Sequence, residues 1–152
     1  MGLSFGVGLA LSARLSGSDR SVYVIMGDGE TNEGTVWEAA MSAVHFGLTR
    51  LTAIIDFNGL QSDGSTGEIM ACDLAAMWSG FGWEVVTVDG HSIPALSEAF
   101  TRPLSDRPRC ILARTTKGKG VSFMEGLAKW HGVTPNRAEA DQAIAEIRRA
   151  AT

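Results

Sequence analysis

The chain has 152 residues, of which 45% are hydrophobic and 20% are charged, and this balance indicates a single α/β domain, residues 1–152, with enough residues to bury a core. The formal net charge of −4 excludes a broad basic surface, so we expect no nucleic-acid partner. Cys72 and Cys110 lie far apart and lack metal-type spacing, which predicts buried thiols and a cytoplasmic protein in reducing surroundings.

The segment from Leu3 to Leu15 is apolar on every side, but it is too short to span a bilayer and contains Arg14. We therefore expect no signal peptide and no membrane segment, and we predict a buried helix instead. Gly6 and Gly8 each cost a helix about 1 kcal/mol relative to alanine, so they indicate close packing against another helix or a ligand.

Four apolar runs alternate with segments of helical periodicity along the rest of the chain. The runs predict strands at 21–26, 51–56, 84–88 and 109–115, and the periodic segments predict helices at 33–46, 74–81, 93–100 and 136–150. This alternation predicts a three-layer α/β fold, with a mostly parallel sheet of at least four strands and helices on both faces. Residues 61–69 are too polar for a strand and predict a loop. Residues 116–135 form a long irregular segment of the kind that often carries function.

Two glycine-containing turns follow the first two predicted strands. The first strand ends in Gly27-Asp28-Gly29-Glu30, and the second ends in Asn58-Gly59-Leu60. A strand, a helix and a second parallel strand form one right-handed crossover, so both turns are expected at the same carboxyl edge of the sheet, where open α/β sheets bind ligands. The Asp28 carboxylate, the Asn58 carboxamide and the Leu60 backbone carbonyl are hard oxygen ligands. They predict a Mg²⁺ or Ca²⁺ site that is shared with substrate phosphates.

The glycines of the first turn agree with a phosphate site. Gly27 is expected to let the backbone approach a phosphate closely, and Gly29 is expected to adopt the positive φ of a sharp turn. Amides at the start of the following helix are expected to face the anion. The alternative is a pair of tight turns without a ligand, which Asn58 at the second strand end disfavours.

Gly-Asp-Gly followed about thirty residues later by Asn resembles the thiamine-diphosphate motif, and the surrounding sequence resembles transketolase over nearly the whole chain. The stretches that carry this resemblance are 27–30, 33–40, 58–64, 81–85, 88–91, 115–124 and 130–132. The resemblance implies a thiamine-diphosphate-binding fold with thiamine diphosphate and Mg²⁺ (or Ca²⁺) as cofactors. It implies Asp28, Asn58 and Leu60 as metal ligands. The cofactor-binding residues that it implies are Gly27, Asp28, Gly29, Glu30, Asn58, Leu60 and His131.

His131, in Trp130-His131-Gly132, matches a family histidine near the reactive end of the cofactor. The resemblance implies a catalytic role there, because a neutral imidazole can relay protons or hold a substrate oxygen. The alternative is a loop histidine bonded to the backbone. His91 follows a strand end and is interpreted as a structural turn residue. Lys117 and Lys119 either attract phosphate at the ligand edge or are solvated loop lysines.

In the transketolase family a separate pyrimidine-binding domain supplies a glutamate that activates the cofactor, and a long segment precedes the region matched here. Nothing in the chain resembles that domain, and the long preceding segment is missing as well. We therefore expect a diphosphate/Mg-binding domain that is N-terminally incomplete. It would act as a subunit of a split transferase that moves a two-carbon ketol or acyl unit between carbonyl compounds such as sugars. The resemblance implies a pyrimidine-binding partner subunit within a homo- or hetero-oligomer. The alternatives are a non-catalytic remnant or binding module and a deoxyxylulose-phosphate-synthase-like enzyme.

Overall fold

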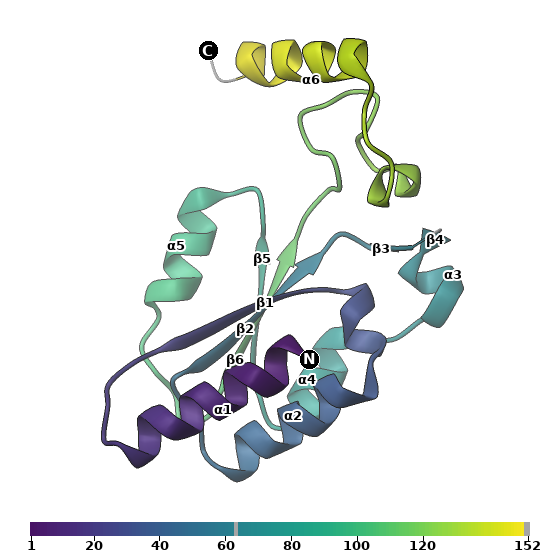
Figure 1. Cartoon of the computed structure of the whole chain (residues 1–152). Helices are drawn as coiled ribbons and strands as arrows, with labels where there is room; N and C mark the ends of the chain where they lie inside the picture. The colour runs from purple at the N-terminus through teal and green to yellow at the C-terminus, as the bar shows by residue number, and fades with distance from the viewer. Residues whose placement is uncertain (63, 151–152) are drawn as a thin grey trace.

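Four strands form one parallel sheet in the computed structural model, which describes residues 1–62 and 64–150. Their order is β1 (Val22–Gly27), β2 (Leu51–Phe57), β6 (Arg109–Arg114) and β5 (Glu84–Asp89), and each neighbouring pair is parallel. Their bounds differ from the predicted ones by at most one residue at either end. The predicted fold class is confirmed, since helices lie on both sides of this sheet (Figure 1).

Two apolar clusters fill the two faces of the sheet. α1 (Gly2–Leu15), α2 (Gly34–His45) and α4 (Leu74–Gly80) cover one face. α5 (Ile93–Thr101) covers part of the other face, where Ala99 and Leu96 pack on strand residues. Because successive strand residues point to opposite faces, Ile55 joins the first cluster and its neighbour Ile54 joins the second. This two-sided burial explains why the central strands read as continuous apolar runs.

α1 packs so closely on the sheet that only glycine fits at one of its positions. A Cβ on Gly6 would lie 2.4 Å from the Val24 side chain of β1. The expected close approach at Gly6 therefore exists, but the neighbour is a strand. Phe5 is 72% exposed on the opposite side of α1, so the prediction of a wholly buried helix is wrong. Among the described residues, no helix is long and apolar enough to cross a membrane.

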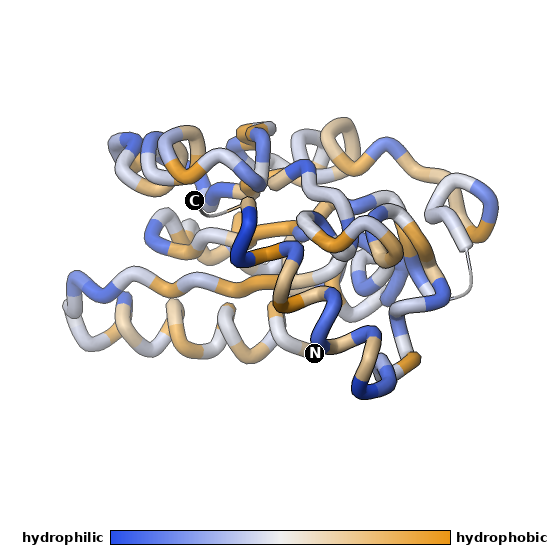
Figure 2. The backbone as a smooth tube through the Cα atoms, turned by 90° about the horizontal axis from the view of Figure 1, so that it is seen from above, coloured by the Kyte–Doolittle hydropathy of each residue, from blue (hydrophilic) through white to orange (hydrophobic). Residues whose placement is uncertain are grey.

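The sheet has an uncovered apolar region at its β1 edge. Tyr23 and Ile25 point away from α1, and Ile25 is 77% exposed. Tyr23 contacts Phe100 of α5 with ring centroids 6.0 Å apart. Figure 2 shows hydrophobic residues recurring along α1 and along the strand that follows it. Parallel sheets are usually covered on both faces, so this edge is unusual for the fold class.

Residues 61–69, for which the sequence predicts a loop, contain short regular elements. β3 (Leu60–Gln61) and β4 (Gly64–Ser65) pair antiparallel, and α3 (Thr66–Met70) follows them. The Ser65 side chain and Glu68 form a capping box at the start of α3, which explains how so polar a segment becomes helical. Cys110 is buried as predicted, whereas Cys72 is exposed, so the buried-thiol prediction is wrong for Cys72.

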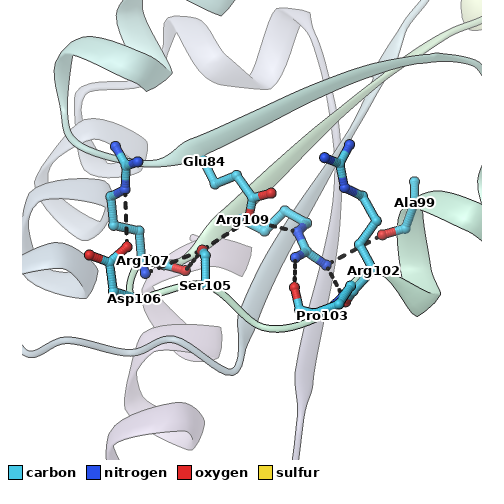
Figure 3. Close-up of polar contacts among 8 residues, drawn as sticks. All are labelled: Glu84, Ala99, Arg102, Pro103, Ser105, Asp106, Arg107 and Arg109. Carbon is cyan, nitrogen blue, oxygen red and sulfur yellow. Dashed lines mark hydrogen bonds and ion pairs between the residues drawn. The ribbon is translucent and has the colours of Figure 1, made fainter.

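A buried arginine organises the amino edge of the sheet, at the end away from the two glycine turns (Figure 3). Arg109 is 5% exposed, and its Nε donates to Glu84 Oε2 at 3.1 Å. Its remaining nitrogens donate to the backbone carbonyls of Ala99, Arg102 and Pro103 at the end of α5. Every partner is structural, so this charged cluster holds α5 to the sheet.

The chain after β6 leaves the sheet through the long loop and ends in α6 (Arg137–Ala150), with the short helix η2 (Ala128–His131) in between. Figure 1 shows α6 apart from the sheet, and none of its residues is buried. Asn136 and Glu139 form a capping box at its start, with hydrogen bonds of 3.0 and 2.8 Å. Glu146 attaches α6 to the loop by accepting hydrogen bonds from the backbone and hydroxyl groups of Ser122.

Candidate functional site

Asp28 joins the two glycine turns. It follows β1, is 3% exposed, and its two carboxylate oxygens accept hydrogen bonds from two different turns. Oδ1 accepts from Gly29 N at 2.8 Å, and Oδ2 accepts from Gly59 N at 2.6 Å. Gly27 pairs with Asp56 in the parallel register, so the ends of β1 and β2 lie side by side at the carboxyl edge. The expected meeting of the two turns is observed.

Burial raises the pKa of the Asp28 carboxyl group, and the nearby Asp56 carboxylate raises it further. The backbone N–H groups of Gly59 and Gly29 act in the opposite direction because they stabilise the charged form. Burial dominates this balance. A cation at this edge would supply the compensating charge that the buried carboxylate lacks.

Asn58 lies directly beside this carboxylate turn. Its Oδ1 accepts from Leu60 N at 2.9 Å, and its Nδ2 donates to Asp56 Oδ2 at 3.3 Å. Asp56 also accepts a hydrogen bond from the Thr115 hydroxyl group, which follows β6. Gly59 adopts a φ of 73°, a left-handed conformation that favours glycine and lets its N–H reach Asp28. The structure therefore brings Asp28, Asn58 and Leu60 into one small region.

Gly29 is required for a reason that differs from the predicted one. It does not adopt a positive φ; instead, a Cβ on Gly29 would lie 2.6 Å from Gln61 Cβ. The turn continues as the short helix η1 (Gly29–Asn32), which includes Glu30, and α2 begins only at Gly34. The amides that follow Asp28 directly are therefore those of η1, and the first of them, Gly29 N, already binds Asp28. A Cβ on Gly27 would meet open space, so the expected close approach of a phosphate there stays a prediction.

A polar cavity of about 680 Å³ opens beside Asn58. Its other lining residues lie at the end of β2 or follow β5 and β6; they are Asp56, His91, Thr115, Thr116, Lys117, Gly118, Lys119 and Val121. Lys119 Nζ lies 2.8 Å from Glu125 Oε1, so its charge is already paired. Lys117 is half-buried in the wall that also contains Asn58. The structure thus separates two lysines that the sequence pattern treats alike.

The two histidines have different surroundings. His91 Nε2 accepts the Thr116 N–H at 2.7 Å, which ties the β5 turn to the start of the long loop and agrees with a structural role. His131 is exposed in η2 and lines a second cavity of about 570 Å³ together with Ser62 and Lys129. η2 lies beside β3, so His131 is near the turn that follows Leu60. It does not line the Asn58 cavity, and its catalytic role stays a prediction.

The donor set fits a hard cation that is held in part by its ligand. Among the described residues, no group of three His, Cys, Asp or Glu side chains could hold a metal ion. The proposed ligands at this edge are one carboxylate, one carboxamide and a backbone carbonyl, namely those of Asp28, Asn58 and Leu60. Mg²⁺ typically takes one or two protein carboxylates and completes its octahedron with phosphates and water, so these residues fit Mg²⁺ bound with a diphosphate.

Residues 12–150 match the family model described as "Transketolase, thiamine diphosphate binding domain". The chain is 41% identical over 149 residues to one of the subunits of the apulose-4-phosphate transketolase of Phocaeicola vulgatus, a match that covers 96% of this chain and 53% of that protein. It is 38% identical over 151 residues to the 6-deoxy-6-sulfo-D-fructose transketolase subunit SqwG of a Clostridium species, covering 97% of this chain and 55% of that protein. The chain thus spans about half the length of these curated relatives.

Solved transketolase structures have the same fold. The structure of transketolase from Pichia stipitis in complex with sedoheptulose-7-phosphate has a TM-score of 0.88 and 29% identity to this chain, covering 97% of it and 24% of the Pichia chain. The transketolase from Campylobacter jejuni has a TM-score of 0.87 and 27% identity, with the same coverage of 97% and 24%. The fold and the match over residues 12–150 lead to the same family. The chain belongs to the transketolase family, and the part of that family it matches is the thiamine diphosphate binding domain.

Proposed function

We propose that this chain is a subunit of a split, thiamine-diphosphate-dependent transketolase and that it supplies the diphosphate- and metal-binding half of the active site. The observation that carries the proposal is the buried Asp28 carboxylate, which is bonded to the turns after both β1 and β2. A fold alone does not need a buried charge at a ligand edge, because such a charge is costly without a cation. Two relatives are named as transketolase subunits, which supports the same role for this chain.

In this proposal Asp28, Asn58 and the Leu60 carbonyl hold Mg²⁺ or Ca²⁺, and the metal carries the diphosphate of the cofactor. Lys117 lines the same cavity as Asn58 and adds positive charge there. Thiamine diphosphate, when bound, supplies the electron sink that stabilises a carbanion beside a carbonyl carbon. The protein contributes binding, orientation and charge. Gly27, Gly29 and Glu30 shape the turn that receives the diphosphate.

His131 is proposed to hold or move a proton at a substrate oxygen. It is exposed at a cavity and lies on η2, beside the strand that follows the proposed metal ligands. A neutral imidazole at the working pH can accept or donate a proton, which is what the transfer of a ketol unit between carbonyl compounds requires.

A pyrimidine-binding subunit is the proposed partner, and a small carbonyl or sugar compound is the proposed substrate. The glutamate that activates the cofactor would come from that subunit, so the complete site would exist only in a homo- or hetero-oligomer. A cytoplasmic location is part of this proposal.

Co-purification with a candidate pyrimidine-binding subunit, followed by a ketol-transfer assay with thiamine diphosphate and Mg²⁺, tests the proposal. Activity that requires both chains and both cofactors supports it. An assembled complex that binds thiamine diphosphate without turnover would identify the chain as a binding module instead. A complex with no affinity for the cofactor would refute the cofactor assignment itself.

A further inference from the structure

The side chain of Gln61 lies against the turn that carries Asp28. Gln61 belongs to β3 and directly follows Leu60. A Cβ on Gly29 would lie 2.6 Å from Gln61 Cβ and 2.8 Å from Gln61 Oε1, so the two residues are in direct contact. Gln61 Oε1 also accepts a hydrogen bond from Asn32 Nδ2 at 3.0 Å. This carboxamide therefore connects β3 to both ends of η1.

The other end of the same carboxamide lacks a partner. Gln61 Nε2 is buried, and within residues 1–62 and 64–150 it has no hydrogen-bond acceptor. A buried N–H group without an acceptor is rare in folded proteins because its lost hydration is not replaced. Trp78 Nε1 is in the same situation, but it lies in the aromatic core between Trp37 and Trp83. Gln61 instead contacts Gly29, the residue after the proposed metal ligand Asp28, and directly follows Leu60.

The orientation of the carboxamide decides which kind of ligand it suits. Asn32 donates to the oxygen of Gln61, so the nitrogen is the end that remains available. An N–H donor suits an anion, whereas a metal ion would need the oxygen. Gln61 is therefore fitted to bind the phosphate part of a metal–phosphate ligand, while Asp28 and Asn58 are fitted to bind the metal.

We propose that Gln61 both positions the Gly29–Asn32 turn and donates its Nε2–H to a phosphate oxygen of the ligand bound at this edge. This inference rests on the proposed function, since the diphosphate provides the acceptor. The donor has no partner before the ligand binds and gains one on binding. Removing the amide therefore has opposite effects on the free and bound states.

The substitution Gln61→Met separates this role from a purely structural one. Methionine keeps the length and packing of the side chain but has no N–H group. The melting temperature of the ligand-free chain is expected to stay the same or rise, because an unpaired donor is removed and the half-buried Asn32 can bond to water. The affinity for magnesium pyrophosphate is expected to fall by about ten-fold. A glutamine whose carboxamide served only to hold Asn32 would give a lower melting temperature and an unchanged affinity.

The experiment measures the melting temperature without ligand and the binding of magnesium pyrophosphate by titration calorimetry, both on the full chain. Gln61→Glu is the nearly isosteric second variant: it keeps the acceptor for Asn32, replaces the donor by a negative charge, and should weaken binding more than Gln61→Met does. Gln142→Met is the matched control, because Gln142 is exposed on α6 and its side chain bonds Glu146 of the same helix. This control should leave the affinity unchanged.

The outcomes distinguish a failure of the role inferred for Gln61 from a failure of the proposed function. Wild-type affinity in both Gln61 variants would overturn the role of Gln61 alone, with the proposed function intact. A lower ligand-free melting temperature of Gln61→Met with unchanged affinity would assign the carboxamide to the hydrogen bond with Asn32 alone and would also overturn the inference. A wild-type chain that does not respond to magnesium pyrophosphate would refute both this inference and the proposed diphosphate site.

Discussion

Replacement of the two proposed side-chain metal ligands by alanine should have unequal effects, and the structure predicts the order. Asp28→Ala removes a buried carboxylate and leaves the N–H groups of Gly29 and Gly59 without their acceptor. Each such loss costs roughly 1–3 kcal/mol, so the two together should lower the free energy of unfolding by about 2–6 kcal/mol. Asn58→Ala leaves the half-buried Leu60 N–H without its side-chain acceptor and removes the exposed hydrogen bond to Asp56, which together cost about 1 kcal/mol.

Metal binding should show the same order. Asp28 is the only charged group among the three proposed ligands, so Asp28→Ala should abolish measurable Mg²⁺-dependent binding of thiamine diphosphate, while Asn58→Ala should weaken it. Urea denaturation gives the stability change, and titration calorimetry of the assembled enzyme with and without Mg²⁺ gives the binding change. Unchanged Mg²⁺ dependence after Asp28→Ala would refute the assignment. A larger stability loss for Asn58→Ala than for Asp28→Ala would refute the hydrogen-bond reasoning.

Three further predictions follow from individual contacts. The pKa of the Asp28 carboxyl group is raised in the folded chain, so the contribution of Asp28 to stability is present below the unfolded pKa of 3.8 and is lost as the pH rises through the folded pKa. Mg²⁺ binds the ionised carboxylate, so the Mg²⁺ affinity, measured by titration, should weaken as the pH falls through the raised pKa. A pH-independent Mg²⁺ affinity would contradict this prediction. Arg109→Met leaves the Glu84 carboxylate without its ion-pair partner and should lower the free energy of unfolding by about 3–5 kcal/mol in a urea titration. A loss below about 1 kcal/mol, which is typical of an exposed ion pair, would refute the role of Arg109 in holding α5 to the sheet. Gly6→Ala should destabilise the chain because the added Cβ would collide with Val24, whereas Gly8→Ala places its Cβ in open space and should stabilise the helix by about 1 kcal/mol. Equal melting temperatures for the two variants would contradict this packing of α1.

The sheet was predictable because each strand carries its own signal. A parallel strand that is buried on both faces reads as a continuous apolar run, and residues 51–56 show such a run together with five buried residues in the structure. Residues 61–69 carry no such signal, since β3 and β4 are two residues each and exist through pairing with each other. The capping box of Ser65 and Glu68 was present in the sequence and could have indicated α3.

The site was predictable to the level of strand ends and no further. The crossover rule brings Asp28 and Asn58 to one edge, and they do lie there. The reason for Gly29 could not be read from the sequence, because it depends on the Gln61 side chain across the turn. The difference between Lys117 and Lys119 depends likewise on Glu125, which forms an ion pair with Lys119. Contacts between turns therefore decide the details that local patterns leave open.

The small residues of α2 do not form a partner surface. Ala39, Ala40 and Ala43 are buried against the chain's own core, so a charge at Ala43 would damage the fold rather than test an interface. The exposed apolar residues of α1 remain. Phe5 and Leu9 lie four positions apart on one helix face, and they are 72% and 48% exposed.

Association through this face of α1 is the last prediction. Interfaces of obligate complexes commonly bury about 2,000 Å² or more and concentrate apolar side chains, which such a helix face supplies. Phe5→Asp should leave the melting temperature of the isolated chain nearly unchanged, because Phe5 makes little contact with the core, but it should weaken self-association or capture of the pyrimidine-binding subunit. Sedimentation velocity at micromolar concentration measures the first effect, and co-purification measures the second. Leu104→Asp is the matched control, since Leu104 is 52% exposed in the loop after α5. If wild type and Phe5→Asp assemble equally well, or if Leu104→Asp disrupts assembly as strongly, α1 is not the interface.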